Sequence, residues 1–123
     1  MSYSLVFTHL ETPNSTSEAW RWEEGMIEPY YEDKREAHPK LKELHDTLTE
    51  KYPCICTLSD EEIDDGVWSD GPLINNFSGD LAMVAFSYNR TDELLPYIIE
   101  KAKGIGITTF DHQTKLIHRP TKD

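Results

Sequence analysis

Apolar residues recur along this chain with two different periods, and these periods predict where strands and helices form. Alternating apolar positions predict a first strand over residues 3–10, and a nearly unbroken apolar run predicts a central strand over residues 81–88. A turn at residues 78–80 makes the preceding residues 73–77 the other strand of a hairpin. Two short strands, residues 107–110 and 115–118, are expected to close the chain.

Three helical segments are expected between these strands. Residues 39–52 form the clearest one, with proline at the first helical position and leucines on one face. A second helix runs to residue 104, where lysines and a glycine mark its end. The earliest segment begins at a capping box, Ser15 to Glu18, but Gly25 and Pro29 predict a short helix, a bend and a second short piece.

The order of these elements predicts the fold class. A strand, helices, two or three strands, a helix and a terminal hairpin indicate an α+β domain with an antiparallel sheet and helices packed on one face. The arrangement is close to a ferredoxin-like split βαβ unit. The 123 residues fit one domain, 1–123, because the sequence has no repeat, linker or low-complexity segment.

Negative charge is concentrated in the first half of the chain. The formal net charge is -11, and residues 1–65 carry 16 Asp and Glu against 6 Lys and Arg. Residues 66–123 carry 7 acids against 6 bases, so the second half is almost neutral. The densest run, residues 60–65, holds five carboxylates that focus a negative field on an approaching basic partner.

The acidic run admits three interpretations: a solvated loop, a contact for a basic protein, or a weak cation site. An EF-hand starting at Asp60 fails, because its sixth and twelfth positions hold Asp65 and Gly71. The Trp beside the run is either a surface anchor or a core residue below a tight turn. The predicted partner-contact residues are Glu61, Glu62, Asp64, Asp65, Trp68 and Asp70.

No motif for catalysis or for a cofactor stands out, so we predict no catalytic residue, no cofactor and no metal. Cys54 and Cys56 are expected to be packed core thiols, since no second ligand pair accompanies them. As an alternative, His9, Asp111 and His112 converge into a pocket that binds a small ligand or carries an acid and base pair.

The net charge also bears on the class of partner. A charge of -11 opposes binding to nucleic acid or to anionic lipid, so a basic protein is the expected partner. The longest apolar run, residues 81–86, is too short to span a membrane, and the first residues do not resemble a secretory signal. We therefore expect a cytoplasmic protein. A homodimer formed through an exposed edge strand at residues 54–58 is a further alternative.

Both ends of the chain resemble short, mostly bacterial uncharacterised proteins. The likeness rests on the start Met1-Ser2-Tyr3-x-Leu5-x-Phe7 and on the closing strand, turn and strand over residues 109–120, with His112 where proline is expected. In size and acidity the chain is also similar to immunity proteins, which neutralise toxins by binding a basic toxin domain. The resemblance implies a non-enzymatic module of immunity or inhibitor type.

Overall fold

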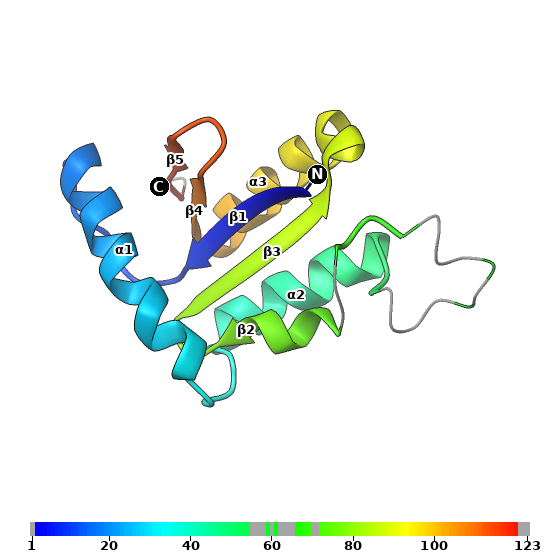
Figure 1. The fold of residues 1–123 in the computed structure, drawn as a ribbon, viewed down its shortest axis with the longest axis horizontal. Helices are drawn as coiled ribbons and strands as arrows, with labels where there is room; N and C mark the ends of the chain where they lie inside the picture. Colours follow the sequence, from blue (N-terminus) through cyan, green and yellow to red (C-terminus); the bar gives the residue numbers. More distant parts are fainter. Residues whose placement is uncertain (1, 55–58, 60, 62–65, 70–71, 121–123) are drawn as a thin grey trace.

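The computed structural model describes residues 2–54, 59, 61, 66–69 and 72–120. In this part of the chain, five strands form one open antiparallel sheet in the order β2-β3-β1-β4-β5 (Figure 1). The strands are β1 (Ser2–Thr8), β2 (Phe77–Ser78), β3 (Leu81–Ser87), β4 (Thr108–Asp111) and β5 (Leu116–His118). The predicted α+β class and antiparallel sheet are confirmed.

The connections between strands have the predicted split βαβ form. The chain leaves β1, passes through helices and returns in β2, and β3 lies between those two strands. It then leaves β3 through a helix and returns in β4, with β1 between that second pair. Two interleaved units of this kind define the ferredoxin-like arrangement, and β5 extends its edge.

In the described residues, three α-helices pack against the sheet: α1 (Thr16–Glu32), α2 (Pro39–Lys51) and α3 (Thr91–Ile105). Helices α2 and α3 share one face, as expected, whereas α1 crosses the opposite face (Figure 1). The division follows the alternation of β1, because Leu5 and Phe7 point toward α2 and α3 while Val6 points toward α1. Among the helices of the described residues, none is long and apolar enough to cross a membrane.

Helix α1 is continuous over 17 residues, which corrects the expectation of two short pieces. Pro29 removes one backbone donor, so only the hydrogen bond to the carbonyl of Gly25 is lost. Trp22 and Tyr30, which lie on either side of Pro29, pack against the same buried cluster, which contains Phe110. Tertiary packing therefore holds the helix together where local preference favours a bend.

Residues 73–77 form less strand than expected. Leu73–Asn76 is a short 3₁₀ helix, and only Phe77–Ser78 pairs with β3. The Leu73 side chain is buried in the cluster beneath α2, and its backbone N–H donates to the Cys54 sulfur at 3.2 Å. These two attachments turn the segment away from the sheet. The predicted edge strand at residues 54–58 lies outside the described residues apart from buried Cys54.

Candidate functional site

Most of the predicted acidic contact residues lie outside the described part of the chain. Glu62, Asp64, Asp65 and Asp70 belong to this group. Glu61 is described and exposed to solvent. Its position is compatible with the predicted contact, which stays a prediction.

Trp68 is a core residue, which agrees with the second of its two interpretations and removes it from the predicted partner-contact residues. Its side chain is only 3% exposed, and its indole N–H donates to the backbone carbonyl of Tyr52 at 2.6 Å. The ring meets Phe86 edge to face, with the ring centres 6.4 Å apart. A partner protein therefore cannot reach this side chain in the structure.

The predicted pocket of His9, Asp111 and His112 does not form. Strand β1 pairs with β4 so that Leu5 lies opposite Asp111, whereas His9 lies just beyond the far end of β1. Four residues of extended chain separate these positions, roughly 13 Å. The two histidines consequently have different partners and different surroundings.

Asp111 has a structural role at the start of the β4–β5 turn. It is fully buried, accepts a hydrogen bond from the Tyr3 hydroxyl, and accepts two more from the backbone N–H groups of Gln113 and Thr114. Burial, followed by this contact with Asp111, raises the pKa of Tyr3. All of these bonds hold the hairpin against β1.

His112 pairs with Glu23, a buried residue of α1 that the sequence pattern did not single out. The Glu23 side chain is fully buried, and its Oε2 receives a hydrogen bond from His112 Nε2. Burial raises the pKa of Glu23, and the adjacent imidazole partly offsets that effect. Trp20 meets the His112 ring edge to face at 5.1 Å. The pair connects α1 to the closing hairpin.

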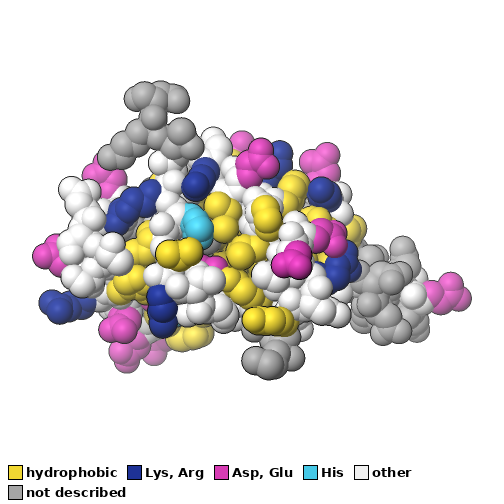
Figure 2. All heavy atoms as spheres, turned by 90° about the horizontal axis from the view of Figure 1, so that it is seen from above, with side chains coloured by type: hydrophobic (Ala, Val, Ile, Leu, Met, Phe, Trp, Pro, Cys, Tyr) yellow, Lys and Arg dark blue, Asp and Glu magenta, His cyan; other side chains and the backbone are white. Residues whose placement is uncertain are grey.

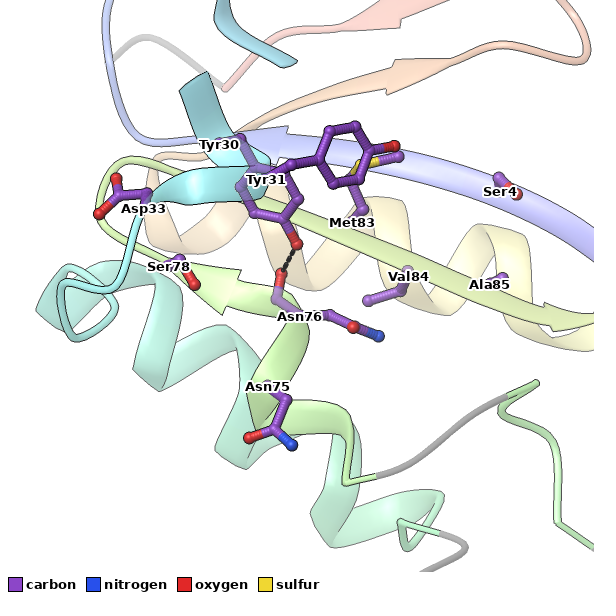
Figure 3. A pocket seen from close by; sticks show the side chains of 10 residues that line it. All are labelled: Ser4, Tyr30, Tyr31, Asp33, Asn75, Asn76, Ser78, Met83, Val84 and Ala85. Carbon is purple, nitrogen blue, oxygen red and sulfur yellow. Dashed lines mark hydrogen bonds between the residues drawn. The ribbon is translucent and has the colours of Figure 1, made fainter. Parts of the chain in front are cut away.

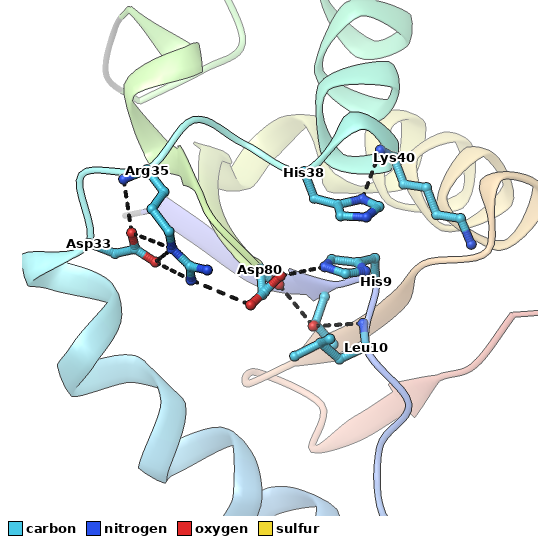
Figure 4. A network of polar contacts seen from close by, with 8 residues as sticks. His9, Leu10, Asp33, Arg35, His38, Lys40 and Asp80 are labelled. Atoms are coloured by element: carbon cyan, nitrogen blue, oxygen red, sulfur yellow. Dashed lines mark hydrogen bonds and ion pairs between the residues drawn. The ribbon is translucent and has the colours of Figure 1, made fainter.

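His9 belongs to a polar network at the end of β1 (Figure 4). Its Nε2 lies 2.6 Å from Asp80 Oδ1, and this hydrogen bond is the main cause that lowers the pKa of Asp80. The His9 ring stacks on the His38 ring, with ring centres 3.5 Å apart and an angle of 13° between the planes. Burial and the neighbouring His9 lower the pKa of His38. A carboxylate thus orients one imidazole while the second stays neutral at pH 7.

Arg35 extends this network toward the end of α1. Its guanidinium group bonds Asp33 Oδ2 at 2.7 Å and Asp80 Oδ2 at 3.4 Å, and Figure 4 shows it bridging the two carboxylates. Gly79 lies directly beneath this bridge with a φ of +59°, and a Cβ there would collide with both Asp33 and Arg35. The backbone conformation therefore favours glycine here, and a larger residue would also displace these two side-chain ends.

The exposed side of α1 carries a row of glutamates that the broken-helix prediction concealed. Glu24, Glu28 and Glu32 are exposed and follow one another at intervals of four residues, so they line one side of the continuous helix. None of the ion pairs formed among the described residues includes them. The last turn of α1 has no basic residue, so Glu32 adds negative charge to the negative end of the helix dipole.

A hollow of about 380 Å³ lies beside the end of this row (Figure 3). Tyr30 and Tyr31 of α1 line one side, and Asn75 and Asn76 of the 3₁₀ segment line another. The Tyr30 hydroxyl donates to the Asn76 carbonyl at 2.5 Å and anchors the end of α1 to that segment. Tyr31 is 70% exposed, so its ring is accessible to another molecule.

A second hollow, of about 510 Å³, lies next to His9, between the end of β1 and the start of α2. Lys40 and Arg119 contribute cationic side chains to its lining. In the described part of the chain, no group of three or more His, Cys, Asp and Glu side chains is placed to hold a metal ion. Comparisons with protein-family models, curated proteins and solved structures returned no match.

Proposed function

We propose that this chain is a protein-binding module of immunity or inhibitor type that captures a more basic protein, such as a toxin domain. The observation that carries the proposal is the exposed glutamate row of Glu24, Glu28 and Glu32. Exposed side chains of one sign that form no ion pair attract a partner of opposite charge and accelerate its association. The acidic run that contains Glu61 adds to the same field.

The position of the row at the end of α1 supports a role in binding. A carboxylate in the last turn of a helix costs folding free energy, typically 0.3–1 kcal/mol, because it faces the negative end of the dipole. Glu32 occupies that position without a basic neighbour in the turn. A basic side chain of the partner near Glu32 would relieve this repulsion. Binding would therefore stabilise the end of α1.

The hollow beside Tyr31 suits a basic side chain of the partner. An exposed aromatic ring binds a cation over its face, and nearby amide oxygens accept its hydrogen bonds. Tyr31 and Asn75 provide these groups. Figure 2 shows one face of the molecule on which hydrophobic side chains gather, with acidic and basic groups around them.

The test is capture of a partner from the native cell lysate at low salt, with elution by rising salt. The variant replaces Glu24, Glu28 and Glu32 with Lys. The matched control replaces Glu43, Glu50 and Glu100 with Lys, because these exposed residues lie on α2 and α3 and change the net charge equally. A second variant reverses Glu61, Glu62, Asp64 and Asp65.

We expect one stoichiometric basic protein that salt releases steeply. Its association rate with the purified chain should fall at least about tenfold in the α1 variant and change little in the control. An equal fall of the association rate in the variant and in the control would show that the rate depends on the net charge of the chain and not on the α1 row. Undiminished affinity after both the α1 reversal and the four-residue reversal would refute the proposal.

A further inference from the structure

The hollow next to His9 is built from parts of the chain that are distant in sequence. Its lining combines His9 and Thr12 after β1, Lys40 of α2, Thr108 of β4 and Arg119 after β5. The volume of about 510 Å³ is within the range of sites for small molecules. A site of this kind differs in place and in charge from the glutamate row of α1.

The permanent charges of this hollow are mainly positive in a protein that is strongly negative overall. Among the described residues that line it, Lys40 and Arg119 are cationic and only Glu11 is acidic. Arg119 is held in place by donating to the Thr12 hydroxyl at 2.5 Å and to the Pro13 carbonyl at 2.7 Å. A guanidinium group has five N–H donors, so three remain for a ligand.

Lys40 occupies an electrostatically unfavourable position. It lies in the first turn of α2, which contains no acidic residue, and a cation there faces the positive end of the helix dipole. Its ammonium group lies close above Gly106, because a Cβ added to that glycine would come within 3.3 Å of it. An anion in the hollow would neutralise Lys40 and interact favourably with the same helix end.

His9 adds an oriented imidazole to these cations. The Asp80 carboxylate forms a hydrogen bond with His9 Nε2, which fixes the orientation of the ring. The other ring nitrogen, Nδ1, is the one left for a ligand. Stacking on His38 holds the ring from the other side, as Figure 4 shows. The hydroxyl groups of Thr12 and Thr108 and the side-chain amide of Asn14 are further groups around the hollow that can donate hydrogen bonds.

We propose that this hollow binds a small phosphate monoester through its phosphate group. A point charge from lysine, a guanidinium fork and neutral donors are the groups that bind phosphate in proteins. The hollow is larger than a phosphate ion alone, so it also accommodates a small organic part. The overall charge of -11 repels a long polyanion such as nucleic acid, but it affects a compact ligand in a local cationic site far less.

The test is titration of the full chain with ribose 5-phosphate and, separately, with inorganic phosphate at equal ionic strength. Calorimetry gives the affinity, and NMR follows the imidazole signals of His9 and His38. Lys40→Gln is the variant. Lys42→Gln is the matched control, because Lys42 is exposed in the first turns of the same helix and does not line the hollow.

We expect saturable binding with shifts of the His9 signals, and at least about tenfold tighter binding of the ester than of inorganic phosphate. Lys40→Gln should weaken binding of the ester by roughly tenfold, as expected for loss of a charged hydrogen bond. Lys42→Gln should leave it unchanged. Absence of saturation, equal effects of the two variants, or inorganic phosphate binding as tightly as the ester would overturn the proposal.

Discussion

Removal of the His112 imidazole tests whether Glu23 lies in the core as a charged group. Glu23 is fully buried; its Oε2 bonds His112, and its Oε1 has no hydrogen-bond partner among the described residues. His112→Ala would therefore leave a buried carboxylate without its counter-charge. Breaking a buried ion pair costs about 3–5 kcal/mol. The His112 side chain is 34% exposed, so water screens part of the interaction, and we expect a loss of about 2–3 kcal/mol.

The loss of stability caused by His112→Ala should depend on pH in a defined direction. Burial raises the pKa of Glu23 above its unfolded value, so its contribution to stability is present below the unfolded pKa and disappears as pH rises through the folded pKa. His112 opposes this rise, and removing it moves the folded pKa further upward. The destabilisation by His112→Ala should therefore be smallest near pH 4 and largest near pH 7.

Urea unfolding followed by tryptophan fluorescence measures this effect, because Trp20 contacts the His112 ring. Glu23→Met is the companion variant, which removes the charge and keeps a side chain of similar length. Glu23→Met should lower the free energy of unfolding less than His112→Ala does at pH 7, since it leaves no buried charge. A loss below about 0.5 kcal/mol for His112→Ala, the same at both pH values, would refute the reasoning.

Three further outcomes follow from the structure. Gly79→Ala should lower the free energy of unfolding by about 1–2 kcal/mol, because its φ of +59° disfavours a residue with a Cβ, whereas Gly25→Ala in open space on α1 should raise it by about 1 kcal/mol in the same urea titration. Trp68→Phe should cost about 1–2 kcal/mol by the same assay and leave partner affinity unchanged, since its N–H bond is buried. The lowered pKa of Asp80 gives stability that is present above its unfolded pKa and lost as pH falls through the folded value, so Asp80→Asn should flatten the acid side of the stability profile.

The elements with strong local patterns were predictable from the sequence. The apolar run of β3 and the leucine face of α2 appear within one residue of their expected bounds. Both patterns depend only on neighbouring residues, which a single sequence displays completely. The alternation of β1 likewise predicts a core strand, although it cannot say which helix covers each face.

Helix α1 was mispredicted because its continuity depends on packing at a distance. Local preference at Gly25 and Pro29 favours a break, whereas contacts with Val6, Phe110 and their neighbours keep the helix intact. The error also concealed a surface. The four-residue spacing of the exposed glutamates forms a row only on an unbroken helix, so the candidate binding face could not be recognised before the tertiary contacts were known.

The register of the strands determines which carboxylate forms a hydrogen bond with His9. This register could not be predicted from the sequence alone. Strand β1 pairs with β3 so that Thr8 lies opposite Leu81, and the next pair outward brings His9 beside Asp80. A shift of one residue would turn His9 to the other face of the sheet and separate the two groups. From the sequence, this histidine was grouped with Asp111, and Asp80 was not singled out. The register makes Asp80 the acid that orients His9, and it thereby places a fixed imidazole in the wall of the cationic hollow.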